Sequence, residues 1–163
     1  MTLSNFLVNG CNTGTLNDMP SAVPVEIATQ ASEELLAACH RLIPQLSSSS
    51  TPLTVSDLAE IVNSASTVLF VARVENQIVG LLTLVLYRIP TAMRAWIEDV
   101  VVDSSARGHG VGEALNLAAL AEAKHRGART VDLTSRPARE AANRLYQRLG
   151  FVLRDTNVYR LSL

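Results

Sequence analysis

The chain has 163 residues, of which 48% are hydrophobic and 18% are charged, and its formal net charge is −1. This length and composition fit one domain with a sizeable core. The nearly balanced charge supplies no overall attraction toward nucleic acid or an anionic membrane, so we expect neither as a partner.

The first 24 residues mix Asn, Thr, Gly, Ser and Pro without periodicity, which is typical of a flexible extension. They lack the basic and apolar regions of a signal peptide, and no run reaches the roughly 18 apolar residues of a membrane span. Cys11 and Cys39 have no metal-ligand spacing and are expected to be ordinary thiols. We therefore predict an extension over residues 1–24, a single domain over residues 25–163, a cytoplasmic location and no metal.

The first half of that domain carries signals for a strand, two helices and a hairpin. Residues 25–30 are a candidate strand, and apolar residues recur at helical spacing from Glu33 to Leu46. Thr54 and Asp57 have the polarity of a capping box, which opens a second helix ending near residue 64. Two aliphatic runs within residues 67–88 then predict a hairpin around Glu75-Asn76-Gln77.

The second half alternates strands with helices. We expect strands at 95–103, 130–133, 151–154 and 158–163, and helices at 110–126 and 137–149. Strands that alternate with helices after an initial run of strands indicate an α/β or α+β fold with a sheet of mixed direction.

The strand "AWIEDVVVD" has apolar residues on both faces at Val100, Val101 and Val102, so it should be central and covered on both sides. Period-two alternation sends Glu98 and Asp99 to opposite faces. We expect one of these carboxylates to line an interior cleft, where it is either paired or useful. The alternative is a solvated carboxylate at the end of a strand.

Three of the eight glycines stand together at Gly108, Gly110 and Gly112. Glycines before a helix let backbone N–H groups approach a ligand, and the helix start adds unpaired N–H groups suited to phosphate. A Walker loop is excluded because no Lys and Ser/Thr follow Gly112. A dinucleotide fingerprint fits poorly, although Asp132 lies about twenty positions on, and a plain turn is the remaining alternative.

The segment Arg107 to Gly112 matches the pattern R/Q-x-x-G-x-G/A, with Leu115 following at the expected place. Together with "ANRLYQRLGF" at residues 142–151, it resembles the GCN5-related N-acetyltransferases, the GNAT family. The resemblance implies a single mixed, mostly antiparallel sheet of six to seven strands. It also implies helices on both faces, splayed parallel strands 4 and 5, and acetyl-CoA as cosubstrate.

Two helices would shape this site. The helix after the glycines should turn a face of small residues to the sheet, and Arg107 offers a charged fork at its start. That face comprises Val111, Ala114, Leu115, Ala118 and Ala121. In the later helix we expect Ala141, Leu145 and Leu149 to be buried, while Glu140 and Arg144 pair at i, i+4 on the exposed side.

By the resemblance, backbone of the strand at Val100 to Val102 holds the pantetheine arm, and the glycine loop holds the pyrophosphate. The implied coenzyme contacts are Val100, Val101, Val102, Arg107, Gly108, His109, Gly110, Val111, Gly112, Glu113, Asn143 and Tyr146. His109 would contribute its backbone only. Tyr146 would protonate the leaving sulfur, and Glu98, or alternatively Asp99, would accept the proton of the amine.

The implied function is direct acetyl transfer from acetyl-CoA to a primary amine of a small molecule, an amino acid or a peptide. The alternative is a non-catalytic acetyl-CoA or CoA-binding module, but such a module would not need Asn143, Tyr146 and a strand carboxylate. The stretch "IEDVVV" followed by "RG" is similar to glucosamine-6-phosphate N-acetyltransferases, yet it is too short to identify the acceptor. The sequence does not decide between a monomer and a homodimer.

Overall fold

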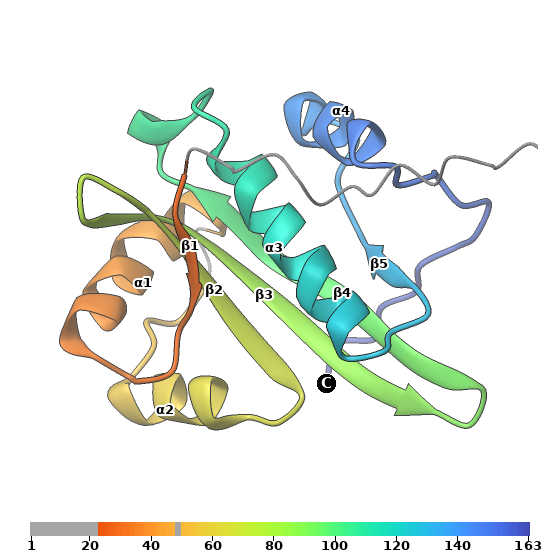
Figure 1. Cartoon of the computed structure of the whole chain (residues 1–163), viewed down its shortest axis with the longest axis horizontal. Helices are drawn as coiled ribbons and strands as arrows, with labels where there is room; N and C mark the ends of the chain where they lie inside the picture. The colour runs from red at the N-terminus through yellow and green to blue at the C-terminus, as the bar shows by residue number, and fades with distance from the viewer. Residues whose placement is uncertain (1–22, 48–49) are drawn as a thin grey trace, which may run out of the picture.

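A computed structural model describes residues 23–47 and 50–163. Within them the chain forms a five-stranded sheet in the order β1-β2-β3-β4-β5 (Figure 1). The strands are β1 (Val25–Ile27), β2 (Thr67–Val74), β3 (Gln77–Ile89), β4 (Ala92–Val102) and β5 (Val131–Leu133). Neighbours pair antiparallel except β4 and β5, which are parallel, so the expected mixed sheet with parallel fourth and fifth strands is confirmed.

Helices cover both faces of this sheet, as expected. They are α1 (Glu33–Leu46), α2 (Val55–Asn63), α3 (Val111–His125) and α4 (Glu140–Arg148), with a 3₁₀ turn at Ser104–Ala106. α3 packs on β2, β3 and β4, whereas α1 packs on β3 and β4 and α2 packs on β2 from the opposite side. α4 lies apart from these layers, beyond β5 (Figure 1).

The helix starts predicted in the first half follow from their caps. The Ser32 hydroxyl accepts a hydrogen bond from the Leu35 amide at 3.1 Å and opens α1. Thr54 and Asp57 form the complete capping box of α2, with each side chain bonded to the backbone of the other. Because such caps satisfy the N–H groups that the first turn leaves unpaired, these two boundaries are fixed locally.

The hairpin between β2 and β3 turns on two residues. Glu75 and Asn76 have φ of 49° and 65°, and Gln77 already pairs with Val74 as the first residue of β3. Two successive residues with positive φ are the mark of a type I′ turn, which matches the twist of the flanking strands. The predicted three-residue connection is therefore one residue shorter.

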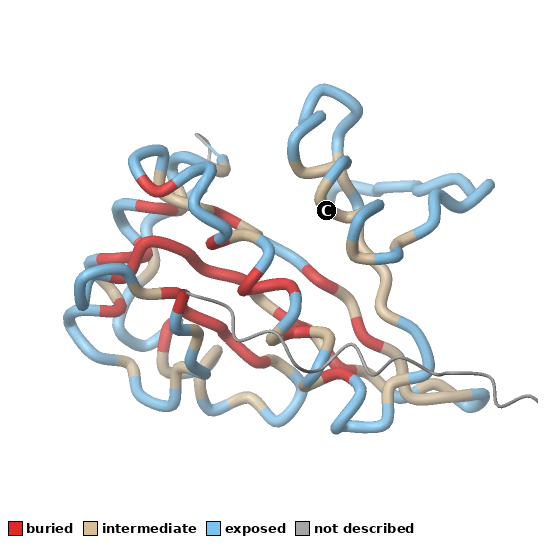
Figure 2. Tube along the Cα trace, turned by 45° about the horizontal axis from the view of Figure 1, so that its top comes forward, coloured by how far each residue is buried: buried red, intermediate tan, exposed pale blue. Residues whose placement is uncertain are grey.

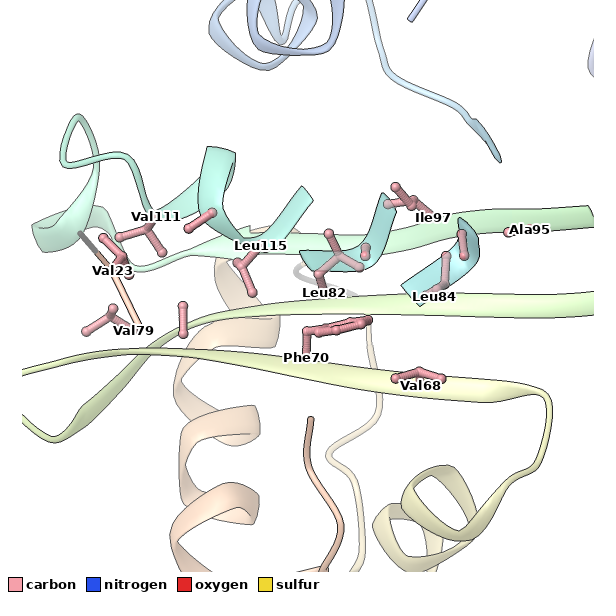
Figure 3. Packing of buried hydrophobic residues seen from close by; sticks show 14 of the residues in the cluster. Val23, Val68, Phe70, Val79, Leu82, Leu84, Ala95, Ile97, Val111 and Leu115 are labelled. Atoms are coloured by element: carbon pink, nitrogen blue, oxygen red, sulfur yellow. The ribbon is translucent and has the colours of Figure 1, made fainter. Parts of the chain in front are cut away.

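The core consists of two apolar clusters separated by the sheet. The first lies between the sheet and α3 and contains Phe70, Leu82 and Leu115 (Figure 3). The second lies between the other face and α1 with α2, and contains Leu42, Leu58 and Leu81. Val101 belongs to the second cluster while Val100 and Val102 pack on the first, so β4 is covered on both faces as predicted.

Two predicted helix faces need correction. In α3, Ala121 is exposed, and the buried residues beyond Leu115 are Asn116, Ala119 and Ala123. In α4 no residue is buried: Ala141 is exposed, and Leu145 and Leu149 are half-buried. α3 packs on β2, β3 and β4, whereas α4 approaches the rest of the domain near the start of α3, where Leu145 faces Gly112. The predicted pair of Arg144 and Glu140 is present, with 3.3 Å between Nη1 and Oε2.

The segment after α4 contains no strand, so the described sheet has five strands where six to seven were expected. Its large apolar side chains are exposed: Val152, Leu153, Val158, Tyr159, Leu161 and Leu163. Figure 2 shows burial concentrated in the sheet and α3, and exposure along the C-terminal segment. A β-rich composition forms a strand only when it pairs with a neighbouring edge, and in the described chain this segment pairs with none.

The described chain begins at Val23, which is buried in the α3-side cluster, and the Pro24 carbonyl accepts a bond from the Arg73 amide at 3.0 Å. The first 22 residues of the predicted extension, including Cys11, lie outside the described residues. Cys39 is a free, buried thiol whose pKa is raised by burial. None of the described helices is long and apolar enough to cross a membrane.

Candidate active site

The parallel pairing of β4 with β5 is short. It joins Ala95–Ile97 to Val131–Leu133, and β4 then continues to Val102 without a strand on that side in the described chain. Backbone N–H and C=O groups along such an edge need partners. The arrangement is the splay expected of these two strands, and it leaves an edge that an extended ligand with amide groups could pair with.

A bulge interrupts β4 at the point where the edge opens. Glu98 pairs with Thr83 and Val101 pairs with Leu81, so Asp99 and Val100 together oppose one residue of β3. Asp99 has φ of 49°, the left-handed conformation. The extra residue shifts the alternation, and both carboxylates are exposed, so the expectation that one of them lies in an interior cleft is wrong.

The glycine loop leads from β4 into α3 with an uncapped helix start. Gly108 and Gly110 have φ of 81° and 78°, and a Cβ at either position would meet no atom within 4 Å. Gly110 is the N-cap of α3 and has no side chain to pair the first N–H groups. Val111, the next residue, is only 1% exposed and anchors the start of the helix in the core. N–H groups at a helix start without a side-chain cap are of the kind that binds phosphate groups such as those of coenzyme A.

Charged side chains stand around this loop. Arg107 is exposed, and its Nε donates to the carbonyl of Val102 at 3.4 Å, which ties the loop to the end of β4. His109 is exposed as well. Glu113, an expected coenzyme contact, lies 4.0 Å from Arg148 of α4. The guanidinium of Arg107 therefore sits beside the loop with donors left for an anion.

Gly112 is where α3 and α4 approach each other. A Cβ on Gly112 would lie 3.4 Å from Leu145 Cδ2 of α4 and 3.8 Å from Val102 Cγ2 of β4. The glycine thus serves helix packing as well as access to the loop.

Tyr146 and Asn143 of α4 differ in their surroundings. Tyr146 is half-buried and packs edge-on against Phe151 with ring centroids 5.9 Å apart. Burial raises the pKa of its hydroxyl, against a smaller opposing effect of the Arg139 charge. Tyr146 thus remains protonated at neutral pH. The side-chain amide of Asn143 donates to the carbonyls of Arg136 at 3.1 Å and Pro137 at 3.4 Å, so this residue holds the loop that enters α4.

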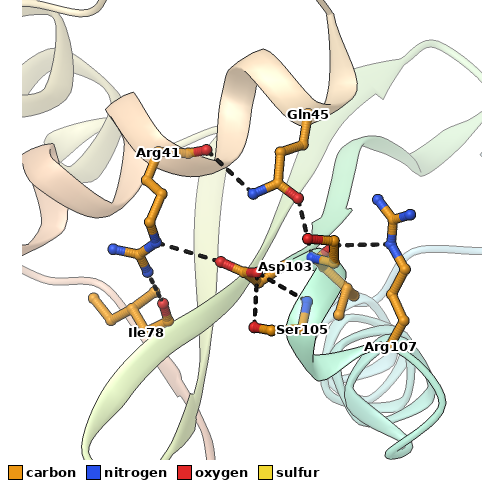
Figure 4. A network of polar contacts seen from close by, with 8 residues as sticks. Arg41, Gln45, Ile78, Asp103, Ser105 and Arg107 are labelled. Atoms are coloured by element: carbon orange, nitrogen blue, oxygen red, sulfur yellow. Dashed lines mark hydrogen bonds and ion pairs between the residues drawn. The ribbon is translucent and has the colours of Figure 1, made fainter.

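The sequence analysis missed a polar network at the entrance to the loop (Figure 4). The Asp103 carboxylate accepts bonds from the amide and hydroxyl of Ser105, at 3.1 and 2.9 Å, and from Arg41 Nε at 3.4 Å. These bonds, the one from the Ser105 amide first, lower the pKa of Asp103. The Asp-Ser-Ser sequence is a local signal for such a turn, but nothing local points to Arg41, which is 62 positions away.

Within the described ranges, no group of three or more His, Cys, Asp or Glu side chains could hold a metal ion. Trp96 Nε1 and Ser135 Oγ are buried and have no hydrogen-bond partner in the same part of the chain. Trp96 lies on β4 opposite Val85 and beside Asp132 of β5. Its N–H is therefore a buried donor two residues before Glu98, within the paired part of β4.

The chain matches the model of the acetyltransferase (GNAT) family over residues 33–151. A transcriptional regulator from Bacillus halodurans C-125 is 30% identical, with a TM-score of 0.72 over 86% of this chain and 99% of that chain. A Trypanosoma brucei acetyltransferase is 29% identical, with a TM-score of 0.69 over 86% and 99%. An aminoglycoside acetyltransferase from an uncultured soil metagenomic sample, in complex with sisomicin, shares the fold at 19% identity, with a TM-score of 0.75 over 86% and 95%. No curated protein matches the chain.

The match identifies the class of protein as an acyltransferase that uses a coenzyme A thioester. The second half of β4, which has no neighbour on the β5 side in the described chain, and the uncapped start of α3 agree with this class. The chain belongs to the GNAT family, and it is an acetyl-CoA-dependent N-acetyltransferase.

Proposed function

We propose that this enzyme transfers the acetyl group of acetyl-CoA directly to a primary amine of a small molecule, an amino acid or a peptide. The observation that carries the proposal is the edge of β4 from Glu98 to Val102, which has no neighbouring strand in the described chain and runs toward the uncapped start of α3. The edge suits the amide-bearing pantetheine arm, and the loop suits the pyrophosphate. The reactive thioester would then lie along β4, near Glu98 and Asp99.

The face of the sheet around Glu98 supports an amine as the acceptor. Leu82, Leu84 and Ile97 point into the α3-side cluster, so their neighbours Thr83, Trp96 and Glu98 take the opposite face. α1 and α2 cover that face around Val101 and Leu69, while Thr83 and Trp96 remain half-buried and Glu98 is exposed. An aromatic ring beside carboxylates attracts a cationic amine.

The chemistry needs two proton transfers, and one residue is proposed for each. Glu98 accepts the proton of the attacking amine, directly or through water, with Asp99 as the second candidate. As the new C–N bond forms and the C–S bond breaks, the Tyr146 hydroxyl donates a proton to the departing sulfur. The raised pKa of Tyr146 supports this role, because the hydroxyl stays protonated and available as a donor.

The first test is binding of acetyl-CoA, measured by calorimetry, to the wild type and to Gly110→Trp. Gly127→Trp is the matched control, because Gly127 has φ of 75°, open space around its Cβ position, and a place at the other end of the same helix. We expect micromolar binding to the wild type and to Gly127→Trp, and none to Gly110→Trp. Equal affinity of both variants for acetyl-CoA would show that the coenzyme does not bind at the glycine loop.

The second test identifies the proton acceptor with a panel of amines, followed by thiol release. With an accepted amine, Glu98→Gln should lower kcat/KM about 10²-fold, because the attacking amine loses its proton acceptor, while Asp99→Asn should stay within about threefold of the wild type. The reverse result would assign the base to Asp99. Activity near the wild type in both variants would assign the proton to solvent. A folded wild type that binds acetyl-CoA but acetylates no amine would favour a binding module over the proposed enzyme.

We further propose a homodimer in which the C-terminal segment pairs with the sheet edge of a second copy. β5 ends the strand order, and the segment exposes Val158 by 70%, Tyr159 by 88% and Leu161 by 84%. Within the described chain, each copy thus offers an edge strand without an outer neighbour and an exposed apolar segment of strand-like composition, which is the reciprocity that a two-fold dimer needs. Sedimentation velocity should show a dimer for the full chain and a monomer after removal of residues 156–163. A monomeric full chain, or a truncated chain that still dimerises, would contradict this assembly.

We propose the cytoplasm as the location, because the enzyme requires acetyl-CoA and Cys39 is a free thiol. Cell fractionation with an antibody to the chain tests it.

A further inference from the structure

The last two turns of α1 contact the entrance to the glycine loop, although α1 itself contains none of the coenzyme motifs. The guanidinium of Arg41 reaches two strand ends: its Nε donates to Asp103 Oδ2 at 3.4 Å, and its Nη2 donates to the carbonyl of Ile78 in β3. One turn later, Gln45 Oε1 accepts a hydrogen bond from the Ser104 amide at 3.0 Å (Figure 4).

Asp103 is the residue through which these contacts act on the loop. Its amide donates to the carbonyl of Val79 at 2.8 Å and thereby closes the end of β4. Its carboxylate caps the 3₁₀ turn at Ser104–Ala106 through Ser105. Arg107 follows that turn, so the position of Asp103 sets the direction in which the chain leaves β4.

Gln45 and Arg41 are also bonded to each other, since Gln45 Nε2 donates to the carbonyl of Arg41 at 3.3 Å. The two residues therefore reach the same turn from neighbouring positions on α1, Arg41 through Asp103 and Gln45 through the Ser104 amide. A single ion pair at 3.4 Å whose arginine is 39% exposed contributes little to stability. The value of these contacts lies in geometry, because a guanidinium has donors fixed in two directions and a lysine does not.

We propose that Arg41 and Gln45 are positioning residues for acetyl-CoA, holding the turn at Ser104–Ala106 so that the glycine loop presents its N–H groups to the pyrophosphate. Neither residue touches the coenzyme or the reacting atoms. This inference rests on the proposed function, since it requires the coenzyme to bind at the glycine loop.

The test compares acetyl-CoA dissociation constants of the wild type, Arg41→Met, Arg41→Lys and Gln45→Met by calorimetry. We expect Arg41→Met to weaken binding about tenfold and Gln45→Met about threefold, as the loss of one or two hydrogen bonds that set the bound geometry. Arg41→Lys should recover only part of the loss, because one ammonium cannot hold Asp103 and the Ile78 carbonyl in the same fixed geometry.

Arg73→Met is the matched control for a loss of stability alone. Arg73 binds Glu26 at 2.7 Å and Glu34 at 2.6 Å, and it also donates to the Asn76 carbonyl, at the hairpin turn between β2 and β3. Its removal breaks more polar contacts than Arg41→Met and should leave the acetyl-CoA affinity unchanged. Once an acceptor amine is known, Arg41→Met should raise KM for acetyl-CoA while kcat at saturating acetyl-CoA stays within about twofold of the wild type, the pattern of an effect on binding alone.

The outcomes separate the inference from the proposed function. Wild-type chain that binds no acetyl-CoA overturns both. Wild-type binding with unchanged affinity in Arg41→Met and Gln45→Met overturns the positioning role alone. An equal loss of affinity in Arg73→Met would also overturn it, because general destabilisation would then explain the effect. If Arg41→Met does not fold, Gln45→Met decides, since Gln45 is exposed on the helix surface.

Discussion

Gly80 of β3 lies directly under α3, and the absence of its Cβ sets how closely this helix approaches the sheet. A Cβ at Gly80 would stand 2.9 Å from Leu115 Cδ1 and 2.9 Å from Val111 Cγ1, well inside the optimum of about 3.5–4.0 Å between carbon atoms. Leu115 is fully buried and Val111 is 1% exposed, so neither side chain can turn into solvent. The helix must therefore move or the side chains must strain.

We expect Gly80→Ala to lower the free energy of unfolding by about 1–3 kcal/mol, the cost of overpacking a core. Elsewhere in a strand the same substitution would stabilise by roughly 0.5–1 kcal/mol, because alanine loses less backbone entropy than glycine. The sign of the change thus reports the contact with α3. Equilibrium unfolding in urea measures it.

A double-mutant cycle with Val111→Ala tests the cause. Removing the methyl groups of Val111 creates a cavity in the wild type. In Gly80→Ala the same change relieves the contact between the new Cβ and Val111 Cγ1. The double variant should therefore be more stable than the sum of the single changes predicts, by about 1 kcal/mol. Additive effects would mean that Val111 does not feel the new methyl group.

Gly80→Ala should also change the affinity for acetyl-CoA, because Val111 is the first residue of α3 and follows Gly110 of the glycine loop. A helix pushed off the sheet moves its N–H groups away from the pyrophosphate, so acetyl-CoA should bind Gly80→Ala more weakly. Wild-type stability together with wild-type affinity would refute the packing argument.

Three further changes probe other parts of the molecule. Tyr146→Phe should lower kcat about 10²-fold and remove the alkaline limb of the pH profile of kcat. That limb should lie above the usual pKa of tyrosine, because burial raises the pKa of the Tyr146 hydroxyl. An unchanged pH profile in a thiol-release assay would reject the role of Tyr146 as the acid. Asn116→Leu should raise the free energy of unfolding by about 1 kcal/mol, because the buried Oδ1 without a partner in the described chain costs more than the bond from Nδ2 to the Gly112 carbonyl, at 2.8 Å, contributes; a lower melting temperature would contradict this. Thr54→Ala should lower the free energy of unfolding by about 1 kcal/mol through loss of the α2 capping box. A urea unfolding curve identical to that of the wild type would show that the cap does not stabilise the fold.

The titration of Tyr146 also makes stability depend on pH in a fixed direction. Its folded-state pKa is raised, so the neutral hydroxyl is favoured in the folded chain. The resulting stabilisation is fully present below the unfolded-state pKa and disappears as pH rises through the folded-state value. Tyr146→Phe should remove this alkaline decline.

The elements that could be predicted from the sequence are those specified by neighbouring residues. The first helix from Glu33 to Leu46, the capping box of Thr54 and Asp57, and the hairpin after Val74 are all local signals that the structure confirms, although the hairpin turn is one residue shorter than predicted. The contact of Arg41 with Asp103 spans 62 positions and depends on how α1 lies across the sheet. No local pattern could indicate it.

The C-terminal segment shows the opposite failure, in which a strong local pattern does not form the expected element. Residues 151–154 and 158–163 have a strand-like composition but no strand in the structure. Strand propensity largely measures packing against neighbouring strands, and the one edge near this segment, β5, has only three residues. The ion pair of Arg154 with Asp132, at 3.4 Å, links the segment to that edge without a strand pairing. The sequence therefore predicts that the segment can form a β-strand, but it does not predict which strand would pair with it.

β4 shows why a buried strand can still be a binding edge. The three valines correctly indicated that both faces of β4 are covered, because face burial depends on side chains that alternate along the strand. Edge pairing depends instead on the backbone of the neighbouring strand, and β5 stops opposite Ile97. The bulge at Asp99 begins two residues later and exposes both carboxylates beside the unpaired groups. A strand with apolar faces and a free polar edge can hold an amide-bearing ligand in the middle of a sheet without exposing the core.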